Sequence, residues 1–407
     1  MWRPACVCPV PCRPVPRRLL PALVVLAVVL TASPASARPN HDRRAAVSVS
    51  LEAATTQVTF GQDVTLSGVI DPPSAGEVVK IRDGGGDLVA TLTTGAAGGF
   101  RTGVTPDVTT TYHAEWSGLD SPDVTVGVRA TIAGLRLANV RLFGTARASG
   151  NVTPARPGEA VTVQLVHKGR VVATRAPLMS AGGGFAATFP IKDVGVFRVR
   201  ARFAADDLLT AVRTTKPRTT PTPQLHEGRR SPFVLLLERR LRALHYHLTG
   251  VNRHFDFRTA DAIMAFRKVQ RMPRNHAVSD AVWRALAHPR RIAPRSRADG
   301  MHIEIDQSRQ VVYTVVDGEV SAIIHTSTGK PSTPTRDGHF TVSRKIAGFS
   351  PHELYYPSYF DGNRAIHGWP DVPAYAASHG CARVPYWTAK WIFGLATIGT
   401  RVIVYHS

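Results

Sequence analysis

Hydrophobic and polar residues alternate in short runs along two stretches of the chain, residues 45–130 and 131–216. Runs such as residues 64–68 are bounded by Gly, Pro and Asp, and short strands spaced by such turn residues are typical of β-sandwiches. Phe100, which follows a glycine, recurs as Phe185, again after a glycine. We therefore predict two copies of one β-sandwich unit.

A helical period follows the Pro-rich residues 215–224, which we interpret as a linker. Hydrophobic residues now recur on one helix face in three sets: Leu237, Leu241 and Leu244; Ala262, Phe266 and Val269; and Val282, Trp283 and Leu286. Thr259 and Ser279 are the expected N-caps of the second and third helices. The pattern predicts a three-helix bundle at residues 228–288 and a second linker at 288–299.

Strand-like patterns return in residues 300–407. The expected strands are residues 302–305, 309–316, 319–326 and 401–405. Asp317-Gly318 joins the second and third of these and is a strong signal for a two-residue hairpin. The fold class predicted for the chain is therefore multidomain and mostly β, with one small helical domain.

Residues 1–37 have the features of a secretory signal. A basic region with Arg13, Arg17 and Arg18 precedes the apolar residues 19–30, and the small residues 35–37 suit a cleavage site. The apolar run is too short to span a bilayer comfortably, and no later run approaches membrane length. We expect a secreted protein with no membrane contact beyond this segment; a signal retained as an anchor is the alternative.

Cysteine use follows from that expectation. Cys6, Cys8 and Cys12 would leave with the signal, so the mature chain would keep only Cys381. An internal disulfide is then impossible. A lone thiol in an oxidising exterior is a liability unless it is buried or used chemically.

The net positive charge of the chain limits the classes of binding partner. The chain holds 50 Lys and Arg against 29 Asp and Glu, a net charge of +21, and residues 215–299 contribute 18 basic and 6 acidic residues. Such a surface suits nucleic acid, anionic lipid or acidic wall polymer, or is simply solvated. Because the chain looks exported and has no nucleic-acid motif, we expect no nucleic-acid partner. The sequence sets no oligomeric state.

Two histidines near Cys381 are candidates for a base, because a cysteine attacks as the thiolate after a base removes its proton. His379 lies in the same segment, whereas His367 comes from a separate segment and is freer to meet the thiol. Gly380 lets the backbone approach a substrate, with N–H groups nearby for an oxyanion. A helix beginning at Pro385 would favour the thiolate from its N-terminus.

The same side chains, His367, His379 and Cys381, are also zinc-ligand types. A fourth ligand is not evident in the sequence, so we predict neither a metal nor an organic cofactor.

The sequence Ile366-His367-Gly368, followed by Ser378-His379-Gly380-Cys381-Ala382-Arg383-Val384, resembles the signature of the L,D-transpeptidase catalytic domain, known as the YkuD family. Residues 328–330, 333–335, 338–342 and 399–402 match further parts of the family pattern. The resemblance covers roughly residues 300–406.

The resemblance implies roles for the matching positions. Cys381 would be the nucleophile and His367 the general base, oriented through its ring by the carbonyl of Gly368. The N–H groups of His379, Gly380 and Cys381 would form the oxyanion hole. Supporting or substrate-binding roles are expected for Ser378, His379 and Arg383, with Tyr356, Tyr359 and Trp369 as pocket walls.

Weaker resemblances concern the upstream residues. Residues 228–288 resemble the peptidoglycan-binding domain of bacterial wall enzymes, although His245 and Arg253 replace the usual glycines. Residues 45–130 and 131–216 resemble bacterial immunoglobulin-like repeats. We expect residues 228–288 to bind the wall and to take no part in the chemistry.

Together these resemblances imply an extracytoplasmic cell-wall enzyme whose partners are peptidoglycan stem peptides and glycan strands. It would cleave before the terminal D-alanine of a tetrapeptide stem and join the acyl group to an amine of a neighbouring stem. Two alternatives stay open. One is a cysteine carboxypeptidase or endopeptidase, because transfer and hydrolysis share a thioester. The other is a non-catalytic wall-binding protein.

Overall fold

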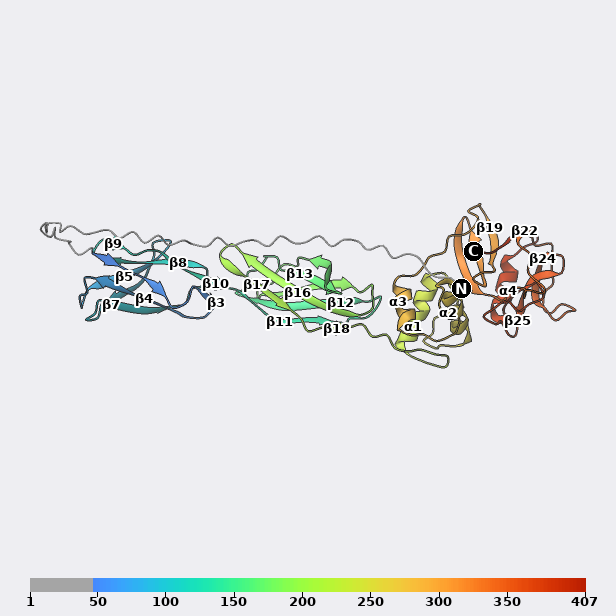
Figure 1. Cartoon of the computed structure of the whole chain (residues 1–407), viewed down its shortest axis with the longest axis horizontal. Helices are drawn as coiled ribbons and strands as arrows, with labels where there is room; N and C mark the ends of the chain where they lie inside the picture. The colour runs from blue at the N-terminus through green and yellow to red at the C-terminus, as the bar shows by residue number, and fades with distance from the viewer. Residues whose placement is uncertain (1–46) are drawn as a thin grey trace, which may run out of the picture. The chain divides into compact units, whose positions relative to one another are not determined.

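The computed structural model describes residues 47–407 (Figure 1). The predicted signal, residues 1–37, and its three cysteines lie outside the described residues. None of the helices described is both long and apolar enough to cross a membrane. The described chain is mostly β, with three helices between its β-rich parts and a fourth near its C-terminal end.

The first β unit comprises residues 48–129. Its strands are β1 Ser48–Val49, β2 Glu52–Ala53, β3 Gln57–Thr59, β4 Val64–Asp71, β5 Val78–Asp83, β6 Leu88–Thr93, β7 Gly99–Val104, β8 Thr110–Trp116, β9 Leu119–Asp120 and β10 Val124–Arg129. One sheet contains β1, β4, β2 and β7, and the other runs β10-β8-β5-β6. Alternate residues such as Val64 and Leu66 are buried, as the hydrophobic pattern predicted.

The second β unit comprises residues 131–219. Its strands are β11 Thr131–Ala138, β12 Thr145–Thr153, β13 Thr162–His167, β14 Arg170–Arg175, β15 Gly184–Pro190, β16 Val196–Ala205, β17 Leu208–Thr214 and β18 Arg218–Thr219. Strand β18 pairs with β16, and Thr220 beside it is buried. The interpretation of residues 215–224 as a free linker is therefore wrong for its middle part, because backbone hydrogen bonds hold that part to the sheet.

The repeated Gly-Phe pattern has a structural reason. Phe100 on β7 faces Gly68 on β4, and Phe185 on β15 faces Gly150 on β12. A side chain at either of these two glycines would collide with the phenylalanine ring opposite. Each ring thus covers a glycine across an antiparallel pair.

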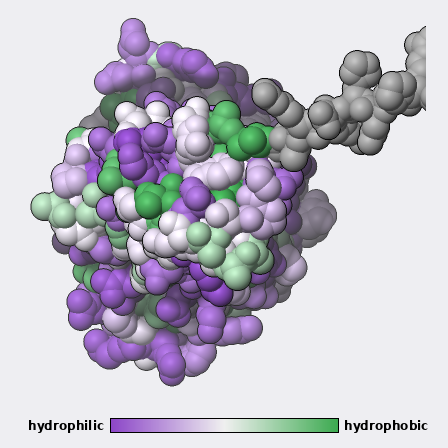
Figure 2. Space-filling view, turned by 90° about the vertical axis from the view of Figure 1, so that its left-hand side faces the viewer, coloured by the Kyte–Doolittle hydropathy of each residue, from purple (hydrophilic) through white to green (hydrophobic). Residues whose placement is uncertain are grey.

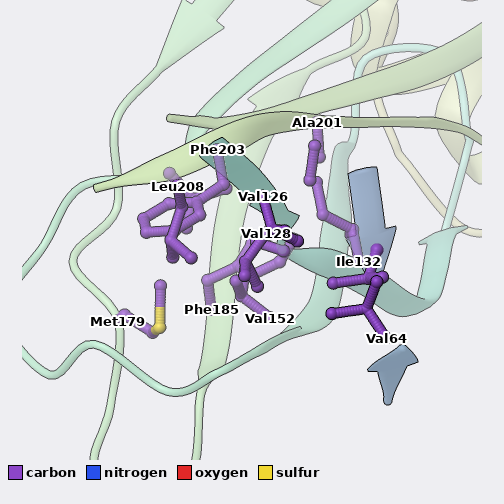
Figure 3. Close-up of a cluster of buried hydrophobic side chains, with 14 of the residues drawn as sticks. Val64, Val126, Val128, Ile132, Val152, Met179, Phe185, Ala201, Phe203 and Leu208 are labelled. Carbon is purple, nitrogen blue, oxygen red and sulfur yellow. The ribbon is translucent and has the colours of Figure 1, made fainter. Parts of the chain in front are cut away.

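One cluster of buried hydrophobic side chains includes residues of both β units (Figure 3). Val126 and Val128 come from the first unit, and Ile132 and Phe203 from the second. Strand β10 pairs with β3 and, at Arg129, with β17.

The surface in Figure 2 shows hydrophobic residues scattered among hydrophilic ones, as is usual for a face in contact with solvent.

The helical segment contains α1 Pro232–Ala243, α2 Phe257–Val269 and α3 Asp280–Ala287. Ser279 is the N-cap of α3 as predicted, but the prediction of Thr259 as an N-cap is wrong. Asp256 caps α2, because its side chain accepts from the backbone N–H of Arg258 and Thr259. Thr259 lies inside the helix, buried, and its hydroxyl donates to Glu238 at 3.2 Å.

The C-terminal domain, residues 301–405, holds two sheets and one helix. Its elements are β19 Met301–Asp306, β20 Val311–Val316, β21 Glu319–His325, β22 Gly338–Thr341, β23 Arg344–Lys345, β24 Tyr355–Asp361, β25 Arg364–Trp369, β26 Ala382–Pro385, α4 Tyr386–Leu395 and β27 Arg401–Tyr405. The sheets run β21-β20-β19-β27-β22 and β23-β24-β25-β26. The predicted hairpin is confirmed, with φ of 49° at Asp317 and 77° at Gly318.

The helical segment and the C-terminal domain share a hydrophobic core. Tyr246, Phe266 and Trp283 belong to the same buried cluster as Tyr313 of β20 and Ile323 of β21. A second cluster lies inside the C-terminal domain, where side chains of β19, β25 and β26 pack against α4. Strands β25 and β26, which carry the candidate site, are therefore supported by α4 on one side.

Candidate active site

Strands β25 and β26 bring the two sequence motifs together. They pair in parallel, with His367 opposite Arg383 and Ile366 opposite Ala382. Cys381 is the residue directly before β26, so it meets the backbone near Ala365. Buried side chains at Ile366 and Ala382 hold this pairing in the domain core. Residues far apart in sequence thus become neighbours through one strand pair.

The thiol of Cys381 lies in a partly buried polar niche. Its Sγ accepts a weak hydrogen bond from the backbone N–H of Ala365 at 3.4 Å and lies 3.9 Å from the carbonyl of Asn363, to which the S–H donates. Burial raises the pKa of the Cys381 thiol, against the opposing effects of the Ala365 N–H and of Arg383 and Arg364. Cys381 therefore rests as a neutral thiol at pH 7.

The imidazole of His367 is held in the tautomer that a general base requires. Its Nδ1–H donates to the carbonyl of Gly368 at 2.9 Å, which leaves Nε2 without a proton. Burial lowers the pKa of His367 to about 4, and the nearby charge of Arg383 acts in the same direction. The ring is therefore neutral across the physiological pH range.

No hydrogen bond joins the two candidate groups within residues 47–407; the thiol faces the Asn363 carbonyl instead of the imidazole. In free enzymes such catalytic contacts are often long and tighten only with substrate bound. The resting pair is a thiol and an imidazole, both uncharged.

The turn before Cys381 is fixed by Ser378. The buried Ser378 hydroxyl donates to the Cys381 carbonyl at 2.6 Å and accepts from the Gly380 N–H at 3.1 Å. The Gly380 N–H is thus used inside the turn. The N–H groups of His379 and Cys381 have no acceptor within residues 47–407, so these two are the donors left for an oxyanion.

Two of the residues predicted to bind substrate, Arg383 and Trp369, lie next to His367. The Arg383 guanidinium lies 4.9 Å from the centre of the Trp369 ring, and that ring meets His367 edge-on at 5.6 Å. His379 has an exposed side chain that makes no hydrogen bond to the described chain. A backbone role suits it better than a side-chain role.

The two predicted tyrosines lie against other elements. Tyr359 is 2% exposed, and the Arg344 guanidinium lies 4.0 Å from its ring centre. Tyr356 packs edge-on against Phe393 of α4, with 5.1 Å between the ring centres. Tyr359 therefore presents almost no surface for a pocket wall.

The sequence reasoning missed Arg364. Its Nη1 donates to Asp361 at 2.8 Å, its Nε is buried without a partner in the described chain, and it packs on the backbone of Gly380. Arg364 stands two positions before the recognised motif, so no motif points to it. Its proximity to Cys381 is created by the strand pairing alone.

The expected helix N-terminus beside Cys381 is wrong. Strand β26, Ala382–Pro385, separates Cys381 from α4, whose first residue is Tyr386. The α4 dipole therefore acts four residues beyond the thiol, and helix-dipole effects fade within the first turn. Trp387 and Trp391 share one face of α4, and both stack on His247.

The zinc alternative finds no support in the geometry. Within residues 47–407, no cluster of three or more His, Cys, Asp or Glu side chains has the arrangement of a metal site. The Nδ1 of His367 is committed to a carbonyl, and the His379 ring points to solvent.

A thiol, a neutral imidazole with Nε2 free, and two unpaired backbone N–H groups make up the equipment of a cysteine acyl-transfer site. Comparison with protein families agrees: residues 300–404 match the model of the YkuD family, the L,D-transpeptidase catalytic domain. The chain therefore carries an L,D-transpeptidase catalytic domain at these residues. Comparison with curated proteins finds no match.

Solved structures with similarity to this chain include several L,D-transpeptidases. That of Xylanimonas cellulosilytica is 32% identical, covering 46% of this chain and 99% of that one, with a TM-score of 0.44. That of Stackebrandtia nassauensis is 20% identical over 46% of this chain and 97% of its own, with a TM-score of 0.30. One from Mycobacterium tuberculosis is 20% identical over 26% and 57%, with a TM-score of 0.25.

Proposed function

We propose that this protein is a peptidoglycan L,D-transpeptidase that uses Cys381 as its nucleophile and His367 as its general base. One observation supports the proposal: within the matched residues 300–404, His367 lies in the base tautomer on β25, and the partly buried Cys381 directly precedes β26, the strand that pairs in parallel with β25. The substrate is a tetrapeptide stem, and the bond cleaved is the one before its terminal D-alanine.

Acylation begins when substrate displaces the Asn363 carbonyl from the thiol. His367 Nε2 takes the proton from Cys381, and Sγ forms a bond to the carbonyl carbon before the D-alanine. The oxygen of that carbonyl becomes an oxyanion held by the N–H groups of His379 and Cys381. Collapse of this intermediate expels D-alanine, whose amine leaves with the proton from His367, and a thioester remains.

Deacylation repeats these steps with a new nucleophile. An amine of a neighbouring stem loses a proton to His367 and attacks the thioester, and the Cys381 thiolate leaves and takes the proton back. Water in place of the amine would give hydrolysis, and the two outcomes share every group described. Arg383, whose guanidinium lies over the Trp369 ring, would contact the stem.

The setting of this activity is the bacterial wall. We infer that the chain is secreted, on the strength of its N-terminal sequence, and that the basic helical segment binds anionic wall material. The two β units act as spacers or binding modules. The L,D-transpeptidase domain and the excess of positive charge in residues 215–299 support this setting.

Mass spectrometry of a purified tetrapeptide stem incubated with the full chain tests the proposal. We expect loss of D-alanine and a cross-linked product when an acceptor amine is present, and neither with Cys381→Ala. Cross-linking by the alanine variant would overturn the assignment of the nucleophile. Release of D-alanine without any cross-link, at all acceptor concentrations, would instead identify a carboxypeptidase.

A further inference from the structure

We propose that Lys268 and Arg274, both in the helical segment, are positioning residues for the nucleophile. They hold in place residues 370–377, the stretch that leads from β25 into the Cys381 turn. They also bond to the backbone of neighbouring segments of the C-terminal domain. The inference rests on the proposed function for its kinetic readout and extends it, because it makes the helical segment part of the catalytic apparatus. This revises the expectation that residues 228–288 serve only to bind the wall.

Lys268 leaves α2 and enters the C-terminal domain. Its side chain is buried, and all three ammonium hydrogens find acceptors there: the Gln310 carbonyl at 3.0 Å, the Thr326 carbonyl at 2.8 Å and the His325 Nδ1 at 2.6 Å. An ammonium group has three donors and no acceptor, so this geometry satisfies it completely. Burial lowers the pKa of Lys268 well below its usual value, and the three hydrogen bonds offset part of the cost of burying this polar group.

His325 carries this contact onward. Because its Nδ1 accepts from Lys268, its Nε2 carries the proton and donates to the Val372 carbonyl at 2.7 Å. Burial and the charge of Lys268 keep the pKa of His325 low, which preserves the neutral ring. Val372 belongs to the stretch before the Cys381 turn. The link Lys268–His325–Val372 thus connects α2 to that stretch in two steps.

Arg274 reaches the same stretch directly. Its Nη1 donates to the Ala374 carbonyl at 2.7 Å, and its Nη2 donates to the Ser308 carbonyl at 3.0 Å. The guanidinium therefore ties residues 370–377 to the loop between β19 and β20. Hydrogen bonds from a charged donor such as this guanidinium contribute more to stability than those between neutral groups.

The backbone that Lys268 binds also supports the nucleophile. The Thr326 hydroxyl donates to the Arg383 carbonyl at 2.6 Å, and Thr328 accepts from the N–H groups of Ala377 and Ser378 at 2.9 Å each. Residues 326–328 thus form hydrogen bonds to the backbone on both sides of Cys381. The helical segment contacts both these residues and the stretch 370–377.

The helical segment also contacts α4, which follows Cys381 in the chain. Trp387 Nε1 in α4 donates to Asp261 of α2 at 2.8 Å. His247 stacks on Trp387 and Trp391, with ring centres 5.1 and 4.1 Å apart. A module that only bound the wall would need none of these contacts. Contacts before and after the nucleophile fit a role in holding Cys381 in place.

The test uses the full chain with Arg274→Ala, Arg274→Lys and Lys268→Met. Arg239→Ala is the matched control, because Arg239 is an exposed arginine of α1 whose side chain makes no hydrogen bond within the described chain. Four quantities are measured: kcat and KM on a soluble tetrapeptide stem, sedimentation with purified wall, and the pH midpoint of Cys381 alkylation by iodoacetamide. Arg274 is on the surface, so its variants keep the test open should Lys268→Met fail to fold.

We expect Arg274→Ala to lower kcat by about 10-fold or more, because small displacements of reacting groups have large kinetic effects. KM should change less than about 2-fold, since ground-state binding is not removed. The alkylation midpoint should fall towards the ordinary thiol value of about 8.5 as the niche loosens. Arg274→Lys, which can still reach one carbonyl, should recover part of kcat, and sedimentation should match the control.

Equal kcat and equal alkylation midpoints for Arg274→Ala and Arg239→Ala would overturn the inference. A loss confined to sedimentation would overturn it as well and would restore the role of wall binding alone. If the wild-type chain proved inactive on stems, the proposed function would fail. The alkylation midpoint would still decide the positioning role, because it reports on the thiol without any transpeptidase reaction.

Discussion

Replacement of Gly380 by alanine tests how closely the nucleophile turn is packed. Gly380 has a φ of +108°, and a Cβ there would lie 2.7 Å from Nε of Arg364. That side chain is not free to move, because its Nη1 is paired with Asp361 at 2.8 Å and its Nε is buried. Alanine at this position must therefore either displace a tethered arginine or shift the backbone that carries Cys381.

The cost follows from these two contributions. Left-handed backbone of this kind costs a residue with a side chain about 1–3 kcal/mol. Breaking the charge-assisted contact of Arg364 adds about 1.5–3 kcal/mol. If the backbone yields instead, a shift near 1 Å at the nucleophile lowers kcat by about 100-fold. Gly362→Ala is the matched control: its φ is +56°, but no atom lies within 4 Å of its Cβ position, so it costs only about 1–2 kcal/mol.

Calorimetry gives the thermal midpoints, and stem turnover gives kcat for both variants and for Gly380→Ala combined with Arg364→Ala. We expect Gly380→Ala to lower both quantities well beyond Gly362→Ala. The double variant should recover stability relative to the sum of its single variants, because removing the arginine removes the clash. If the two glycine variants behaved alike in stability and in kcat, the packing argument would be refuted.

Three further predictions concern the base, the pH dependence and the shared core. His367→Ala should lower kcat by about 10²–10⁴-fold, the usual contribution of a general base, while His379→Ala stays near wild type; steady-state kinetics decides between the two histidines. Burial holds the pKa of His367 at about 4 in the folded state, against 6.5 in the unfolded state, so the stability due to this group is present above pH 6.5 and is lost as pH falls towards 4. Accordingly kcat/KM on a small stem should stay flat from pH 7 to pH 5, and a midpoint near 6.5 would contradict the assignment. Trp283 is 1% exposed and donates to the Pro223 carbonyl at 2.9 Å. Trp283→Ala should therefore lower the free energy of unfolding by about 3–5 kcal/mol, measured by urea denaturation.

Local chemistry made parts of the fold predictable from sequence. The Asp317-Gly318 hairpin was predictable because a type I′ turn needs two residues with positive φ, and few residue pairs adopt that conformation easily. The buried faces of Leu237 and Leu241 followed from helical spacing. Thr259 was misassigned as an N-cap because Asp256, three residues earlier, is a competing cap and makes both hydrogen bonds. Spacing alone does not choose between two capping residues of similar preference.

The candidate site likewise has residues that the sequence predicts and residues that only the tertiary structure reveals. Cys381 and His367 are recognisable because they lie in a motif, and the pairing of β25 with β26 brings the two segments of that motif together. The roles of Arg364 and of the Lys268–His325 link depend on contacts between segments that no periodicity relates. A lysine at the end of an amphipathic helix reads as a solvated charge. Only the packing of α2 on β21 turns it into a buried amine that donates to three acceptors.

The uncharged resting pair also fits the exterior in which we propose the protein works. A thiolate is the form that oxidants attack, and susceptibility follows thiolate character and exposure. Burial raises the pKa of Cys381, so at neutral pH only a few per cent or less of the thiol is ionised. The same burial lowers the pKa of His367, so the base is never lost to protonation near neutrality. Transfer of the proton then needs a substrate that moves the thiol away from Asn363 and supplies a carbonyl carbon to attack. The lone cysteine predicted for the mature chain is thus protected when idle and remains available for acyl transfer once a stem is bound.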